Sequence, residues 1–187
     1  RDESGLIVCA DRGHRIAESL GIVPDFIVGD FDSYTGELPD DVEIHRSIPE
    51  KDDTDTILAV RIALERGYRE IQLYGGLGAR FDHSFANIQT LIFAYEKGCE
   101  MTICDPDNVL TLRGAGEYEF PCKNDWYFSI FALTEKAEIG ELKGVKYPLE
   151  AYEMTMGYPI GVSNEITADK AYLRINSGIV LVIESKK

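Results

Sequence analysis

The sequence predicts an α/β N-terminal domain with a mainly parallel sheet, followed by an all-β sandwich C-terminal domain. Up to about residue 106, short apolar runs alternate with segments of helical period, and strands that alternate with helices pair in parallel through right-handed crossovers. From about residue 107 short alternating segments separated by Gly, Pro and Asn take over, which is typical of a sandwich or barrel. We therefore expect one domain over residues 1–106 and a second over residues 107–187, joined at the turn-rich tetrad Asp105-Pro106-Asp107-Asn108.

Each expected element follows from an apolar pattern and its end signals. Buried apolar runs predict strands over residues 6–10, 26–28, 71–74 and 101–104. Apolar residues at helical spacing predict helices over residues 14–20, 55–65 and 84–97. Gly21, Gly67 and Gly98 mark the helix ends, and Thr54 is the expected N-cap of the second helix. In the second half, alternation predicts strands over residues 109–112, 127–133, 137–142, 171–175 and 179–183.

The composition argues against several classes of protein. With 187 residues, 44% of them hydrophobic, the chain is long enough for one large core or two small ones. Its formal net charge of -14 argues against nucleic-acid binding, because that backbone is bound by clustered Lys and Arg. We expect no membrane association, since no apolar stretch approaches the roughly 20 residues that span a bilayer and no signal peptide precedes the first strand. The four cysteines form no C-x-x-C pair, which favours reduced thiols in a cytoplasmic protein.

Two acidic phrases predict a magnesium and phosphate site. Asp30 and Asp32 directly follow an apolar run, and Asp52 and Asp55 precede and begin a predicted helix. Because α/β sheets bind ligands at the carboxyl ends of their strands, we expect these carboxylates to meet at one sheet edge. Mg²⁺ takes a few carboxylate oxygens and leaves its other positions to water and phosphates. The metal would also neutralise charge, since an acidic protein repels a nucleotide triphosphate and attracts a cationic second substrate.

Both phrases also have a purely structural interpretation. Asp30 and Asp32 would then be turn residues that accept hydrogen bonds from nearby backbone amides. Asp52 and Asp55 would be acidic residues that the helix dipole favours at a helix N-terminus.

A third phrase, Gly75-Gly76-Leu77-Gly78-Ala79-Arg80-Phe81-Asp82-His83, adds glycines, a cation and another carboxylate. It is not a Walker A loop, because no Gly-Lys-Ser or Gly-Lys-Thr follows. Arg80, a planar cation with five donors, precedes the helix expected at 84–97, where it and the helix-end amides can hold a phosphate. The alternatives are a flexible strand-to-helix turn and, for His83, a capping or structural role instead of that of a general base.

The three phrases in this order, with residues 20–33 around the first and Asn87 after the third, closely resemble the thiamin pyrophosphokinase family, also called thiamine diphosphokinase. Residues 142–149 and 160–165 look like the thiamine-domain phrases of the same family, so the resemblance covers nearly the whole chain. Asp11 and Gly13 match part of an Ala-Asp-Gly-Gly phrase, from which Arg12 and His14 depart. The strand and glycine-rich turn with which the family normally opens are not found before Leu6.

The resemblance implies an ATP- and Mg²⁺-binding α/β domain and a thiamine-binding β-sandwich domain, assembled as a homodimer whose active sites use both subunits. It implies transfer of a diphosphate from ATP to the hydroxyl of thiamine, which gives thiamine diphosphate and AMP. The site residues that it implies are catalytic metal ligands at Asp30, Asp32, Asp52 and Asp55, further catalytic residues at Arg80 and Asp82, nucleotide contacts at Asp11, Gly13, Gly75, Gly76, Arg80, His83 and Asn87, and thiamine contacts at Ser163 and Asn164.

Two other functions fit the same residues. A metal-dependent nucleotide phosphohydrolase would use the aspartates to release phosphate or diphosphate from ATP without thiamine. A noncatalytic nucleotide or thiamine sensor would bind without turnover, although a binding-only site gains little from so many clustered charges.

Overall fold

The computed structural model describes residues 5–29, 42–46, 53–78 and 80–187, and the chain divides into two compact units, Arg1–Ile71 and Gln72–Lys187. No helix in these ranges is both long and apolar enough to span a bilayer. All four cysteines lie in the described ranges, and none of them forms a disulfide.

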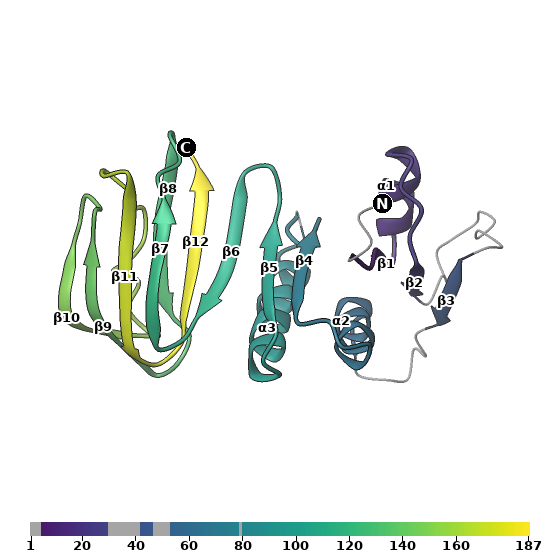
Figure 1. Ribbon diagram of the computed structural model, residues 1–187, viewed down its shortest axis with the longest axis horizontal. Helices are drawn as coiled ribbons and strands as arrows, with labels where there is room; N and C mark the ends of the chain where they lie inside the picture. Colours follow the sequence, from purple (N-terminus) through teal and green to yellow (C-terminus); the bar gives the residue numbers. More distant parts are fainter. Residues whose placement is uncertain (1–4, 30–41, 47–52, 79) are drawn as a thin grey trace. The chain divides into compact units, whose positions relative to one another are not determined.

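The described part of the first unit contains a parallel sheet with the strand order β1-β2-β3 (Figure 1). Its strands are β1 (Val8–Ala10), β2 (Phe26–Gly29) and β3 (Glu43–Arg46), and its helices are α1 (Gly13–Ser19) and α2 (Asp55–Glu65). The central strand β2 is buried along its whole length, and α2 packs on both β1 and β2. This unit therefore confirms parallel pairing for its three strands.

Helix α2 has the predicted bounds because its end signals are local. Thr54 Oγ1 accepts a hydrogen bond from the backbone N–H of Ile57 at 3.3 Å, as an N-cap does. After the helix, Gly67 adopts a φ of 91°, a conformation that glycine reaches without steric cost.

Strand β3 was not predicted, because its four residues are mostly polar. Tertiary contacts hold it in place: Arg66 donates to both carboxylate oxygens of Glu43 at 2.9 Å, and the His45 ring meets the Phe26 ring edge-on at 5.1 Å. The Arg66 hydrogen bond also lowers the pKa of the Glu43 carboxyl. None of these contacts is visible in a local sequence window.

The described residues of the second unit, 72–78 and 80–187, form one helix and two sheets. One sheet has the order β4-β5-β6-β12-β8 and the other has the order β10-β9-β11-β7. Helix α3 (Phe81–Glu96) packs against β5 and β6. The strands are β4 (Glu70–Tyr74), β5 (Glu100–Cys104), β6 (Asn108–Arg113), β7 (Gly116–Pro121), β8 (Trp126–Ala132), β9 (Lys136–Lys143), β10 (Leu149–Thr155), β11 (Lys170–Ser177) and β12 (Val180–Lys186).

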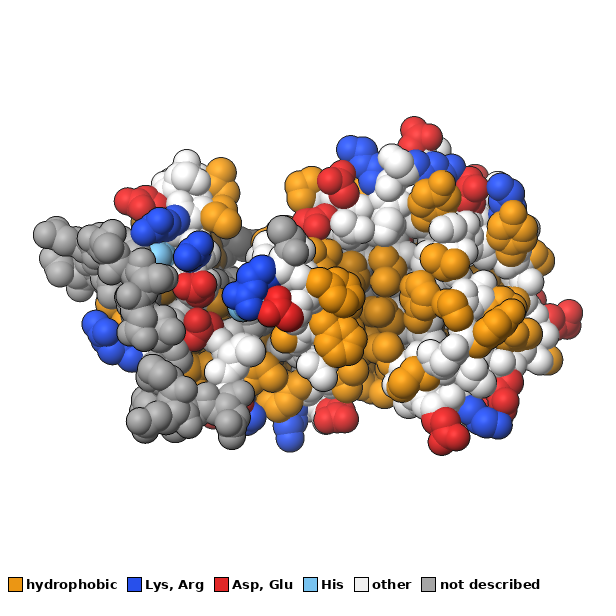
Figure 2. All heavy atoms as spheres, turned by 180° about the vertical axis from the view of Figure 1, so that it is seen from behind, with side chains coloured by type: hydrophobic (Ala, Val, Ile, Leu, Met, Phe, Trp, Pro, Cys, Tyr) orange, Lys and Arg blue, Asp and Glu red, His pale blue; other side chains and the backbone are white. Residues whose placement is uncertain are grey.

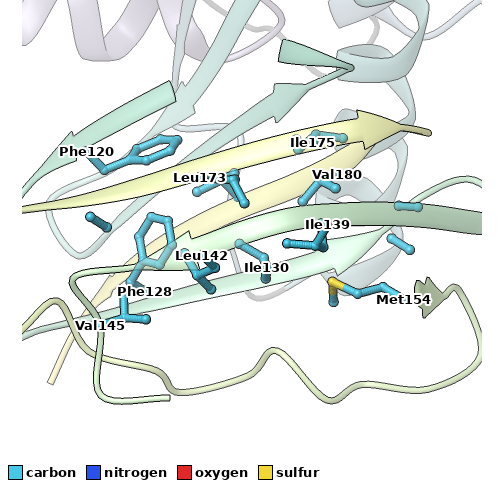
Figure 3. Packing of buried hydrophobic residues seen from close by; sticks show 14 residues of the cluster. Phe120, Phe128, Ile130, Ile139, Leu142, Val145, Met154, Leu173, Ile175 and Val180 are labelled. Atoms are coloured by element: carbon cyan, nitrogen blue, oxygen red, sulfur yellow. The ribbon is translucent and has the colours of Figure 1, made fainter. Parts of the chain in front are cut away.

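The core of this unit is shared by its two sheets. Side chains from β7, β9, β10 and β11 pack with side chains from β8 and β12 in one buried cluster (Figure 3). Phe120 of one sheet and Phe128 of the other have ring centroids 5.0 Å apart. The C-terminal part is therefore β-rich, with a hydrophobic core between two layers.

The strands before residue 106 do not all lie in a parallel sheet. β5 pairs antiparallel with β6, with Thr102 opposite Thr111, so β4 and β5 share a sheet with C-terminal strands. The tetrad expected to join two domains is a tight turn between β5 and β6, closed by a 2.9 Å hydrogen bond from Asp105 N to the Asn108 carbonyl. The boundary at 106/107 stays a prediction.

Strands β7 and β10 were also missed, and both are edges of their sheet. Only Phe120 is buried in β7 and only Met154 in β10, because an edge strand leaves much of its surface in solvent. Pro121 at the end of β7 is tolerated for the same reason, since an edge position needs no N–H donor. The alternation in β7 covers only Glu117 to Phe120, which is too short a pattern to predict a strand.

Candidate functional site

The turn after β1 places Asp11 beside the carboxyl end of β2. The Asp11 backbone N–H donates to the carbonyl of Val28 at 2.8 Å, and Asp11 adopts a φ of 46°, which Asp tolerates better than most residues. Its own carbonyl lies 2.8 Å from Nδ1 of the buried His14, the second residue of α1. Gly13, the other predicted nucleotide contact here, is the first residue of α1. Asp30 and Asp32 follow β2 in sequence and lie outside the described residues.

The second acidic phrase leads into α2. Asp55 is the first residue of the helix and is half-buried, and Asp53 pairs with Arg61 of the same helix through a 3.0 Å contact. Asp52 lies outside the described residues. Asp55 is thus the one predicted magnesium ligand that can be placed. Among the described side chains, no three or more of His, Cys, Asp and Glu gather as a metal site requires.

The glycine phrase forms the turn between β4 and α3. Gly75 has a φ of 72°, and Gly76 is buried so tightly that a Cβ would lie 2.8 Å from Leu73 Cδ2. The side chain of Asn87 donates to the Gly76 carbonyl at 2.7 Å. The Gly78 N–H donates to Ser84 Oγ at 3.1 Å. Two side chains of α3 therefore hold this glycine turn.

Arg80 and Asp82 pair with each other at the start of α3. Arg80 Nη2 donates to Asp82 Oδ2 at 2.6 Å, and Arg80 Nε donates to Asp82 Oδ1 at 3.3 Å. The Arg80 hydrogen bond holds the pKa of the Asp82 carboxyl below its ordinary value, and the same bond raises the pKa of Arg80. Both side chains remain open to solvent, with exposures of 73% and 65%. A guanidinium has five donors, so Arg80 keeps donors for a phosphate.

The Arg80–Asp82 pair lies at the first turn of α3. α3 begins at Phe81, three residues before the predicted start, and the His83 N–H donates to Asp82 Oδ1 at 3.0 Å. The predicted nucleotide and catalytic residues of this unit thus lie in the glycine turn and in or next to the first two turns of α3. They are Gly75, Gly76, Arg80, Asp82, His83 and Asn87. Ser84 was missed by sequence reasoning. Its signal was the spacing of three from Asn87, which puts both side chains on one helix face.

The predicted thiamine residues lie together but in different environments. Asn164 is only 6% exposed, and its side chain serves the backbone: Oδ1 accepts from the N–H groups of Tyr147 and Glu165 at 2.9 Å each, and Nδ2 donates to the Tyr147 carbonyl at 2.8 Å. Ser163 is exposed, with a φ of 57° and its N–H bonded to Ser129 Oγ at 3.0 Å. A serine in this left-handed conformation costs energy that the surrounding bonds must offset.

Comparison with known families covers both halves of the chain. The family model described as thiamin pyrophosphokinase, catalytic domain, matches residues 1–103, and the model described as thiamin pyrophosphokinase, vitamin B1 binding domain, matches residues 117–180. The chain belongs to the thiamin pyrophosphokinase family.

Individual members of the thiamin pyrophosphokinase family are similar over most of their length. Thiamine pyrophosphokinase from Bacillus subtilis is 32% identical over 190 residues, which cover 98% of this chain and 89% of that protein. Thiamin pyrophosphokinase 1 from Caenorhabditis elegans is 26% identical over 170 residues, covering 86% and 70%. The crystal structure of the Bacillus subtilis protein matches with a TM-score of 0.91 at 30% identity, over 100% of this chain and 90% of that one.

Proposed function

We infer that this protein is a thiamine diphosphokinase, which transfers a diphosphate from ATP to the hydroxyl of thiamine and releases thiamine diphosphate and AMP. The observation that carries this conclusion is the presence, on one chain, of matches to both family domains, together with 32% identity to a thiamine pyrophosphokinase over nearly its whole length. The functional division into residues 1–106 for ATP and Mg²⁺ and residues 107–187 as a thiamine-binding β-sandwich is part of the proposal.

The reaction needs alignment and charge stabilisation more than a covalent nucleophile. The thiamine hydroxyl oxygen attacks the β-phosphorus of ATP, the bond from that phosphorus to the oxygen shared with the α-phosphorus breaks, and AMP leaves. Arg80 and the glycine turn would hold the phosphates, with Asp11, Gly13 and His83 as further nucleotide contacts. When bound at Asp30, Asp32, Asp52 and Asp55, Mg²⁺ would neutralise phosphate charge.

The described part of the chain offers two carboxylates that can accept the hydroxyl proton, Asp55 and Asp82. The Asp82 carboxylate is held by Arg80, which lowers its pKa, and a carboxylate with a lowered pKa is a weaker proton acceptor. Asp55 lies at the start of α2, at the end of the acidic phrase. We therefore propose that Asp82 positions Arg80, and the variant Asp55→Asn tests whether Asp55 takes the proton.

Thiamine would be held in the C-terminal part, with Ser163 as the contacting side chain and Asn164 as its support. Ser163 is exposed. Asn164 is buried, and its side chain accepts hydrogen bonds from the backbone N–H groups of Tyr147 and Glu165. The net charge of -14 suits a thiazolium cation.

We further propose that the enzyme works as a cytoplasmic homodimer with shared sites. On the face shown in Figure 2, hydrophobic side chains gather over the unit Gln72–Lys187, and contiguous exposed apolar surface is typical of an interaction site. The large exposed hydrophobic residues of this unit include Tyr74, Phe81, Phe85, Tyr158, Ile160 and Val162.

The proposed support by Asn164 predicts a double effect of Asn164→Ala. The free energy of unfolding should fall by about 1–3 kcal/mol, because the backbone groups of Tyr147 and Glu165 lose the partner that the buried Asn164 side chain supplies. Thiamine binding should weaken more than ATP binding. Urea unfolding and titration calorimetry measure the two effects, with the exposed Asn176→Ala as control. Equal losses for both ligands would place Asn164 outside the thiamine site.

The function itself is tested by incubating the protein with ATP, Mg²⁺ and thiamine and separating the products by mass spectrometry. We expect AMP and thiamine diphosphate in equal amounts, and no product when any one component is omitted. ADP with thiamine monophosphate would contradict diphosphate transfer. ATP breakdown that ignores thiamine would instead indicate a phosphohydrolase, and ligand binding without any product would indicate a sensor.

A further inference from the structure

We propose that Ser84 and Asn87 are positioning residues that clamp the glycine turn, and that Asn87 acts on the nucleotide through Gly76 and not by touching ATP. This inference rests on the proposed function for its ligand. Its structural basis is the pair of hydrogen bonds that join one face of α3 to the two ends of the turn, at the Gly76 carbonyl and the Gly78 N–H.

The turn needs such a clamp because its own sequence does not fix it. Glycine has more backbone freedom to lose on folding than any other residue, and three glycines lie within residues 75–78. Gly75 has a positive φ, and a Cβ at Gly76 would press on the side chains of Leu73 and Ile103. Since glycine has no side chain with which to anchor the turn, hydrogen bonds from outside the turn help to fix it.

Ser84 connects the glycine turn to the backbone of Arg80. Its hydroxyl accepts from Gly78 N at 3.1 Å and lies 3.4 Å from the Gly78 carbonyl and 3.5 Å from the Arg80 carbonyl, so it can donate to either oxygen. Ser84 is buried, which protects these bonds from competition by water. The backbone around Arg80 is therefore held from α3, while the guanidinium remains exposed.

Asn87 holds the other end of the turn with one of its two amide hydrogens. Its Nδ2 lies 2.7 Å from the Gly76 carbonyl, which is a short and well-formed hydrogen bond. Releasing this bond to reach a ligand would leave the carbonyl of the buried Gly76 without that donor. The nucleotide affinity that depends on Asn87 should therefore come from the order of the turn.

Ser84→Ala and Asn87→Ala test the clamp against a matched control, Thr90→Val. Thr90 is also buried in α3 and donates to the Ala86 carbonyl at 3.0 Å, so the control removes a hydroxyl of the same helix that does not contact the turn. Hydrogen exchange of the segment 75–80 is followed without any ligand. Titration with ATP and Mg²⁺ gives the nucleotide Kd, and steady-state kinetics give KM for each substrate.

Both alanine variants should accelerate exchange in the turn and weaken ATP binding by about tenfold, the effect of losing one positioned hydrogen bond. KM for thiamine should stay unchanged, and Ser84→Thr should restore the wild-type values. Thr90→Val should lower thermal stability without either effect.

Unchanged exchange and unchanged ATP affinity in Ser84→Ala would overturn the proposal. A loss of ATP affinity in Asn87→Ala with hydrogen exchange as in the wild type would also overturn it, because Asn87 would then be a direct contact. Equal effects of Thr90→Val on exchange and ATP affinity would overturn it as well. If the wild-type protein forms no thiamine diphosphate, the proposed function fails, while ligand-free exchange still decides whether the clamp exists.

Discussion

Arg80→Ala lowers turnover on the order of a hundred- to a thousandfold, because it removes a preorganised donor from the charge that develops on the transferred phosphates. Little stability should be lost, since the Arg80–Asp82 pair is exposed and such pairs contribute little to folding. Arg80→Lys should recover only part of the rate, because an ammonium lacks the planar fork of a guanidinium. Steady-state kinetics and thermal unfolding measure the two quantities.

Arg174→Ala is the control for this variant, because it removes an exposed arginine from β11 at no predicted site. The pH dependence adds a second check. Since Arg80 lowers the pKa of Asp82, the pair is fully formed above the ordinary carboxyl pKa and is lost only as the pH falls through the lowered value. Turnover of Arg80→Ala within about threefold of the wild type would remove Arg80 from the site, given the size of effect expected for such a donor.

Asp55→Asn has the second large expected effect, a loss of turnover on the order of 10²–10⁴-fold if Asp55 accepts the proton of the thiamine hydroxyl. Asparagine keeps the size of the side chain but cannot take up a proton. The free energy of unfolding should fall by no more than about 1 kcal/mol, because Asp55 is the first residue of α2 and the variant loses a favourable helix-dipole interaction.

Glu65→Gln is the matched control, since it removes the same charge from the other end of α2. Initial rates of AMP release and urea unfolding are measured for both variants. A folded Asp55→Asn protein with near-normal turnover would show that another group accepts the proton and that the metal does not depend on Asp55.

The parts of the fold that the sequence could predict are those with local causes. The α2 helix has its apolar period and its N-cap in one window, so both ends were predicted correctly. The start of α3 was predicted too late, because no capping residue marks it in the sequence. Arg80 is in the N-cap position and makes no side-chain cap hydrogen bond. Strand β3 depends on Arg66, which lies 23 residues beyond its partner Glu43.

The candidate site, too, could be predicted only where its causes are local. The motif Gly75 to His83 predicted glycines and Arg80 ahead of a helix, and its described residues lie between β4 and the start of α3. The spacing of Ser163 and Asn164 could not reveal that one is exposed and the other buried, because the burial of Asn164 depends on a loop seventeen residues away at Tyr147. Whether these residues bind ligands stays a prediction.

The turn between β5 and β6 has a consequence for how the two family domains are inherited. The catalytic-domain match ends at residue 103, yet β5 at its end is hydrogen-bonded to β6, which lies beyond it. A fragment cut between them would leave unpaired the strand edges that now meet over Thr102–Cys104 and Val109–Thr111, and open strand edges invite aggregation. The two halves are therefore not modules that recombination could exchange freely, since each would have to bring a strand that fits the other's open edge.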